Sequence, residues 1–222
     1  MIGYGLIIIA IIITLASQGY IKSMYNKTRK ISVKSNMTGR EVARKILDEN
    51  GLNDVDVIKV NGVMTDHYDP RSKVVRLSTE VYENDSIASV SIAAHECGHA
   101  IQDSVGYTFL RFRNSIVPLV NFASRAGYVI IMIGLFTTLV KLLWVGIILE
   151  LVILLFQLIT LPVEFNASNR GLEQINKISI VDSSELNKCK KMLKAAALTY
   201  VASVAVAILD ILRLVLIAIR RD

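Results

Sequence analysis

The chain has 222 residues, 53% of them hydrophobic, and a mean hydropathy of +0.48. This composition excludes an ordinary soluble domain and predicts several membrane spans. The net charge of +6 is modest, and the basic residues lie beside apolar segments, so they indicate membrane topology and not a nucleic-acid surface. The two cysteines, Cys97 and Cys189, do not indicate a disulfide framework.

The first predicted span covers residues 2–21, which are almost wholly apolar and numerous enough to cross a bilayer. No basic residue precedes this segment, whereas Lys22, Lys27, Arg29 and Lys30 follow it. That order is wrong for a signal peptide and right for an anchor whose amino end lies outside.

Residues 22–106 read as a small α+β subdomain adjacent to the membrane. Residues 38–41 form a capping box, and the helix that it opens ends before Gly51. Strands are predicted at residues 55–60 and 73–78, where β-branched residues are frequent.

Two features of this subdomain could bear on a functional site. We expect the second strand to be an edge strand that pairs with an extended substrate through Val74, Val75, Arg76 and Leu77. A subdomain with only a packing role is the alternative. In the loop predicted between the strands, His67 is either an additional metal ligand or an ordinary loop histidine.

The next helix, predicted to begin at Asp85 or Ser86, contains His-Glu-x-x-His. His95 and His99 are four residues apart, so on a helix they share a face and can bind one metal ion. Glu96 lies beside that ion, where it can take a proton from a metal-bound water. Zinc suits this ligand set, lowers the pKa of its water to about 7 and polarises a carbonyl, which predicts peptide-bond hydrolysis. Two core histidines stacked by accident would give the same pattern.

Three further spans are predicted after the metal-binding helix. Residues 107–113 are basic and aromatic and resemble a membrane-surface segment. The spans themselves cover residues 115–140, 142–161 and 195–219, with Lys141 in the turn between the first two. A capping box at residues 182–185 opens the helix that becomes the last span.

The distribution of basic residues predicts a site that faces the cytoplasm. Those within residues 22–30, 111–125 and 177–194 all fall on one side of the four-span scheme, and Lys141 falls on the other. Arg220 and Arg221 disagree, because four spans place that end of the chain outside. Either the rule is broken there or the last helix is not a simple span.

A metal site with two histidines needs a third ligand. The candidate carboxylates are Glu150, Glu164, Glu173 and Asp182. Glu164 is favoured, because it follows an apolar span and shares its helix with the small residues Ala167 and Ser168. In many His-Glu-x-x-His enzymes a glutamate on a later helix is the third ligand. An interface glutamate is the alternative.

With these motifs the chain resembles the YugP-type membrane zinc metallopeptidase family. The matching segments are residues 95–102, 161–168, 195–201, 65–70 and 75–78, and the likeness runs from about residue 2 to the end. The resemblance implies a multi-pass membrane protein with Zn²⁺ held by His95, His99 and Glu164 and with Glu96 as general base. This family is similar to HtpX-type and prenyl-protein membrane proteases, in which an edge strand near the zinc aligns the substrate. Asp is common in the family at the position of Asn166, which keeps hydrogen-bonding capacity here but lacks the charge.

Several polar residues lie inside the predicted spans. Ionisable groups are costly there and usually face the protein interior or a water-filled cavity, which applies to Glu150, Asp210 and Arg213. Asp210 and Arg213 are three residues apart and can form a structural ion pair, or they line a wet path to the zinc. Tyr200 could stabilise the oxyanion of the tetrahedral intermediate, or it is an interfacial belt residue.

The sequence therefore predicts a mostly α multi-pass membrane protein of about four transmembrane helices with a small α+β zincin-like subdomain. Residues 1–222 would form a single membrane-embedded metallopeptidase domain in the cell membrane. The predicted activity is zinc-dependent endopeptidase action on a peptide or a membrane protein. A catalytically inactive zinc-binding scaffold and a membrane transport protein are the alternatives. An intact Glu96 argues against the scaffold, and the absence of an inverted repeat in the sequence argues against the transporter.

Overall fold

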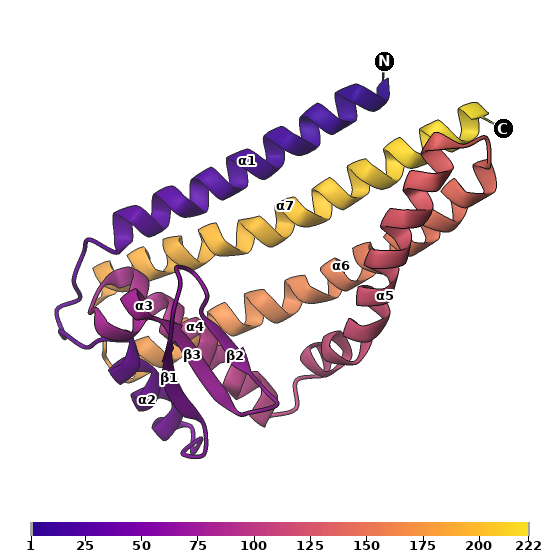
Figure 1. Ribbon diagram of the computed structural model, residues 1–222. Helices are drawn as coiled ribbons and strands as arrows, with labels where there is room; N and C mark the ends of the chain where they lie inside the picture. The colour runs from indigo at the N-terminus through magenta and orange to yellow at the C-terminus, as the bar shows by residue number, and fades with distance from the viewer. Residues whose placement is uncertain (1, 222) are drawn as a thin grey trace. The chain divides into compact units, whose positions relative to one another are not determined.

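The computed structural model describes residues 2–221 and divides them into two compact units (Figure 1). We call residues 20–110 and 163–197 the site unit, because they contain the His-Glu-x-x-His motif. The remaining residues, up to 19, from 111 to 162 and from 198 onward, are the membrane unit. Four long helices contribute residues to both units, namely α1 (Ile2–Thr28), α5 (Thr108–Phe136), α6 (Val140–Lys177) and α7 (Ser183–Arg221).

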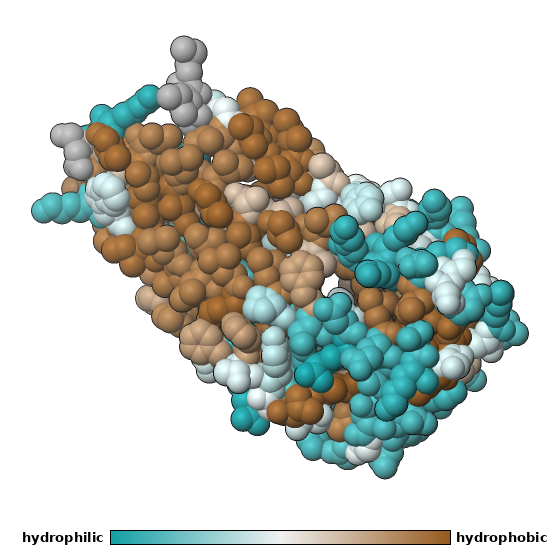
Figure 2. Space-filling view, turned by 180° about the vertical axis from the view of Figure 1, so that it is seen from behind, coloured by the Kyte–Doolittle hydropathy of each residue, from teal (hydrophilic) through white to brown (hydrophobic). Residues whose placement is uncertain are grey.

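Among the described residues, four helices are long and apolar enough to cross a membrane, which confirms the predicted number of spans. They are the same four helices, α1, α5, α6 and α7. The face of the membrane unit seen in Figure 2 is almost continuously apolar. That surface suits contact with lipid, because no polar backbone group within a helix is left unpaired there.

The helices extend beyond the predicted spans. α5 already begins at Thr108 and includes most of the basic and aromatic segment 107–113. The turn between the second and third spans covers residues 137–139, so Lys141 lies in the first turn of α6. Pro162 lies inside α6, where this helix passes from the membrane unit to the site unit. Hydropathy identifies the apolar part of a helix, but the hydrogen-bonded helix continues beyond that part.

Within the membrane unit, a small apolar cluster and one arginine connect α5, α6 and α7. Ile131, Leu143 and Leu214 are buried against one another in this cluster. The guanidinium of Arg221 donates hydrogen bonds of 3.0–3.4 Å to three carbonyl oxygens where α5 ends, those of Gly134, Leu135 and Thr137. These carbonyls have no partner within the helix, so Arg221 caps α5. Capping of α5 therefore explains the presence of Arg221, whose position disagreed with the positive-inside rule.

The site unit contains a three-stranded sheet in the order β1-β3-β2. β1 (Asp56–Val60) is parallel to β3 (Val74–Ser78), and β2 (His67–Asp69) is antiparallel to it. The prediction of an edge strand formed by Val74, Val75, Arg76 and Leu77 was wrong, because β3 is the central strand. Its second neighbour, β2, lies in the segment predicted to be a loop and is only three polar or aromatic residues long, too short to show alternation.

The predicted helix caps of the site unit are present. Thr38 and Glu41 form the reciprocal hydrogen bonds of a capping box at the start of α2 (Gly39–Glu49). Ser86 caps α4 (Ile87–Ser104), the helix with the His-Glu-x-x-His motif, by accepting a hydrogen bond from the amide of Ser89. A short helix, α3 (Thr79–Glu83), joins the sheet to α4.

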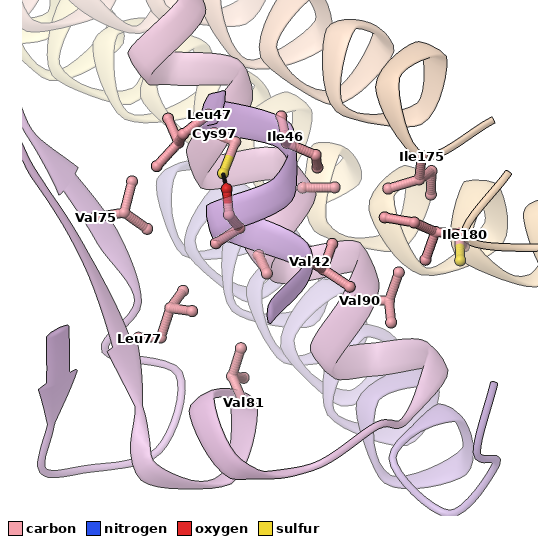
Figure 3. Close-up of a cluster of buried hydrophobic side chains, with 14 of the residues drawn as sticks. Val42, Ile46, Leu47, Val75, Leu77, Val81, Val90, Cys97, Ile175 and Ile180 are labelled. Atoms are coloured by element: carbon pink, nitrogen blue, oxygen red, sulfur yellow. Dashed lines mark hydrogen bonds between the residues drawn. The ribbon is translucent and has the colours of Figure 1, made fainter. Parts of the chain in front are cut away.

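The core of the site unit forms around the face of α4 that points away from the two histidines. Buried side chains of α2, β3, α4 and the end of α6 pack together there, including Ile46, Leu77, Val90 and Ile175 (Figure 3). The thiol of Cys97 donates to the carbonyl of Ala43 at 3.5 Å within this core. Burying this face on several elements fixes the rotation of α4 about its axis and so the direction in which its histidines point.

Candidate metal centre

Two glycines allow α4 and α6 to approach each other backbone to backbone. A Cβ atom on Gly98 would collide with the carbonyl group of Ala167, and one on Gly171 would collide with the carbonyl group of Ala94. Any larger residue at either position would force the helices apart. This close approach places Glu164, on α6, opposite the histidine face of α4.

Three side chains converge at this helix contact. The Oε2 atom of Glu164 lies 3.3 Å from Nε2 of His95 and 3.7 Å from Nε2 of His99. The three candidate ligand atoms all lie within 4.8 Å of one another. Zinc bonds of about 2.1 Å in tetrahedral geometry would separate ligand atoms by roughly 3.4 Å. The two distances from Glu164 to the histidines are close to this value, so the three side chains are near enough to be candidates for one zinc ion.

The structure distinguishes Glu164 from the three other carboxylates that the sequence offers as a third ligand. Glu173 lies further along the same helix and is exposed, and Asp182 forms an ion pair of 2.7 Å with Lys34. Glu150 belongs to the membrane unit. Glu164 alone among these four joins His95 and His99 in the part of the chain that the structure describes.

The second nitrogen of each histidine ring has its own hydrogen-bond partner. Nδ1 of His95 lies 3.0 Å from Oγ of Ser168, and Nδ1 of His99 lies 3.0 Å from Oε1 of Gln102. The amide nitrogen of Gln102 donates to the carbonyl of Val163 at 2.8 Å, which can only accept. Oε1 of Gln102 must therefore face His99 and accept the hydrogen that Nδ1 of that ring carries. Nε2 of His99 is then left with a lone pair directed at the site.

Asn166 extends this network. Its Oδ1 atom accepts hydrogen bonds from Nε2 of Gln102 at 3.1 Å and from Nε of Arg170 at 2.7 Å. The amide oxygen thus makes the contacts that a carboxylate at this position could also make. No sequence motif predicts these contacts of Gln102, Ser168 and Arg170. The available signal was helical spacing, since Gln102 follows His99 by three residues and Ser168 follows Glu164 by four.

Glu96 is buried beside the convergent group. Its side chain accepts a hydrogen bond of 3.0 Å from the backbone amide of Tyr68, in β2. Burial raises the pKa of Glu96 to about 7, with the charge of His95 lowering it and that of Glu164 raising it further. A carboxylate with this pKa can both accept and release a proton near neutral pH.

Among the described residues, the group that could hold a metal ion consists of His95, His99 and Glu164, and His67 is not one of its members. The ring of His67 is on β2, and its Nδ1 atom lies 2.8 Å from the carbonyl oxygen of Thr65. Tyr200 belongs to the membrane unit, so its catalytic role stays a prediction.

Comparison with known proteins agrees with this geometry. A family described as "Putative neutral zinc metallopeptidase" matches residues 4–219. The chain belongs to this family. It is 46% identical over 201 residues to the "Putative membrane protease YugP" of Bacillus subtilis (strain 168), covering 90% of this chain and 89% of that protein. No solved structure matches the chain.

The candidate ligand atoms of this site suit zinc, the metal that the family description names. Two imidazole nitrogens and one carboxylate oxygen are the ligands of many catalytic zinc sites, which keep a fourth position for water or substrate. Hard cations such as Mg²⁺ or Ca²⁺ prefer sites made of oxygen atoms alone. His95, His99 and Glu164 could therefore hold Zn²⁺.

Proposed function

We propose that this chain is a zinc-dependent membrane endopeptidase. The observation that carries the proposal is the convergence of His95, His99 and Glu164 beside the buried carboxylate of Glu96. A purely structural zinc site has no use for such a carboxylate, whose burial costs stability. Its presence favours hydrolysis over the inactive scaffold.

Each residue of the site would have a separate role. His95, His99 and Glu164 would hold the ion, while Ser168 and Gln102 fix the orientation of the two rings. Zinc, when bound, polarises a substrate carbonyl and lowers the pKa of a water that it binds to about 7.

Glu96 would transfer the proton. It accepts one from the attacking water as the water oxygen bonds to the carbonyl carbon of the scissile peptide. It then delivers this proton to the amide nitrogen as the carbon–nitrogen bond breaks. The hydrogen bond from the Tyr68 amide keeps Oε2 of Glu96 in place during both transfers.

An extended substrate would pair with β2, and not with β3 as the sequence suggested. β2 lies at the edge of the sheet, and it is the strand whose backbone contacts Glu96. Strand addition at this edge would place a substrate peptide bond near the proton acceptor. The substrate would be a peptide or a membrane protein, and the site would face the cytoplasm of the cell.

Replacing Glu96 tests the mechanism. Glu96→Gln keeps the size of the side chain and an acceptor for the Tyr68 amide, but it cannot take a proton. We expect normal zinc content and cleavage of a model peptide or membrane protein reduced roughly 10²–10⁴-fold, the usual contribution of a general base. Glu173→Gln, at an exposed position on α6, is the matched control and should cleave normally. Wild-type cleavage by Glu96→Gln would refute the mechanism.

A further inference from the structure

A polar pocket of about 280 Å³ lies within the membrane unit. Residues of α1, α6 and α7 line it, and all of them belong to this unit. The polar ones that matter here are Thr14, Ser17, Glu150, Gln157, Ser203 and Asp210. So many polar groups gathered in helices that cross a bilayer are costly, and such groups usually serve a function.

The hydroxyl groups of this pocket present oxygen lone pairs to it. Each hydroxyl has a single hydrogen, and three of these hydrogens are already donated to backbone carbonyls one turn earlier. Thr14 donates to Ala10 at 2.9 Å, Ser17 to Thr14 at 3.0 Å and Ser203 to Thr199 at 3.0 Å. These hydroxyls can therefore only accept a further interaction.

Gln157 adds an amide oxygen that lacks a partner. Its Oε1 atom is buried, and no hydrogen-bond donor reaches it among the described residues. A buried oxygen without a partner destabilises the folded protein, and a ligand that it can bind removes this cost. The donors of the lining are the amide nitrogens of Gln157 and Gln18 and the hydroxyl of Thr199, and the oxygen acceptors of the lining outnumber them.

The charge of the lining sets the charge of a suitable ligand. Asp210 already forms an ion pair of 3.2 Å with Arg213, one turn further along α7. Glu150 is the other acidic residue of the lining. No lysine, arginine or histidine is found among the residues that line the pocket. One net negative charge suits a monovalent cation, whereas sites for Ca²⁺ collect several carboxylates.

We propose that this pocket binds an alkali cation, Na⁺ or K⁺, in the membrane unit. Glu150 supplies the charge, and Gln157 and the hydroxyls of Thr14 and Ser203 supply neutral oxygen ligands. The volume accommodates the ion together with several waters, since a water occupies about 30 Å³ in the liquid. The bound ion ties three membrane-crossing helices together. This property is separate from peptide hydrolysis and does not depend on zinc.

The test is cation binding by the full chain in detergent, measured with ²²Na⁺ and by thermal unfolding. The salts compared at equal ionic strength are NaCl, KCl and choline chloride, whose cation is too large for close oxygen ligands. We expect saturable binding of about one ion per chain and an unfolding midpoint that rises with Na⁺ or K⁺ but not with choline, because a ligand bound only to the folded state stabilises it. The preferred ion is the one that competes more strongly for the ²²Na⁺ site.

Variants locate the site. Glu150→Gln should abolish saturable binding, and Gln157→Met, which keeps the shape but removes the amide oxygen, should weaken it at least tenfold. Glu173→Gln is the control for loss of a carboxylate elsewhere, and Glu96→Gln should bind the cation normally because hydrolysis is not involved. Equal midpoints of the wild type in all three salts, absence of saturable binding, or wild-type affinity in Glu150→Gln would each overturn the proposal.

Discussion

Glu96 is the residue whose environment bears most directly on chemistry. It is 7% exposed, and its one described hydrogen bond comes from a backbone amide. Desolvation by the surrounding protein disfavours the charged carboxylate and raises its pKa from the usual 4.5 to about 7. A group held in this way is ready to exchange a proton near neutral pH.

The raised pKa predicts a pH dependence of stability for the zinc-free protein. The folded state binds the proton of Glu96 more tightly than the unfolded state, so the stabilisation is complete below pH 4.5 and is lost as the pH rises through about 7. The loss should be about 3.5 kcal/mol, because the pKa is raised from 4.5 to about 7 and each pKa unit corresponds to about 1.4 kcal/mol. Unfolding of chelator-treated wild type and Glu96→Gln should be compared between pH 4.5 and 8. An equal decline in both proteins would show that Glu96 is not the cause.

The sequence predicts some site residues better than others. His95, Glu96 and His99 follow from a local spacing that any helix converts into one shared face. Glu164 was one of four candidate carboxylates, because its approach depends on the packing of two helices far apart in the chain. Gln102 and Ser168 are marked in the sequence only by their helical spacing from His99 and Glu164, and the structure identifies them as partners of the ligand rings.

At the scale of elements, the site exists because α4 and α6 touch through their backbones. Gly98 stands between the ligand residues of the motif and faces the carbonyl of Ala167. The glycine looks incidental in a motif written as His-Glu-x-x-His. In the folded protein it determines how near Glu164 can come to His95 and His99.

Substitution of Gly98 tests this packing. Gly98→Ala should push α6 away from α4 and weaken zinc binding by roughly tenfold or more, the usual cost of disturbing the support of a metal ligand. The unfolding midpoint should also fall, since overpacking costs about 1–3 kcal/mol. Gly19→Ala, where an added Cβ meets nothing within 4 Å, is the matched control. Gly98→Ala with wild-type zinc affinity and stability would contradict the packing account.

The sheet shows the limit of prediction from sequence patterns. Both longer strands were predicted, but the strand order was not, because β2 has only three residues and no alternation. As a result, the substrate edge was assigned to Val74–Leu77 when these residues form the central strand. Strand order is a tertiary property, and no local pattern in β3 reveals how many neighbours it has.

At the scale of the whole molecule, the chain combines apolar helices with a unit that has its own soluble-type core. Three of the long helices change character along their length, apolar in the membrane unit and amphipathic or polar in the site unit. Hydropathy predicted the four crossings well, because lipid imposes a simple requirement on composition. It predicted the helix ends poorly, because polar residues can continue a helix outside the membrane.

The positive-inside rule does not account for every basic residue of this protein. Arg221 disagreed with the four-span scheme when charges alone were counted. Its guanidinium binds the carbonyls that end α5, so it has a reason to be present that is independent of membrane orientation. The proposal of a site that faces the cytoplasm accordingly rests on the basic residues of the other segments.

The most direct test of the central claim is the zinc content of the purified protein, measured for the wild type, Glu164→Ala and Glu173→Ala. The two variants remove a glutamate from the same helix, but only Glu164 lies with the two histidines. We predict about one zinc per chain in the wild type and in Glu173→Ala, and much less in Glu164→Ala. A well-folded wild type without zinc, or equal zinc in all three proteins, would contradict the proposed metal centre.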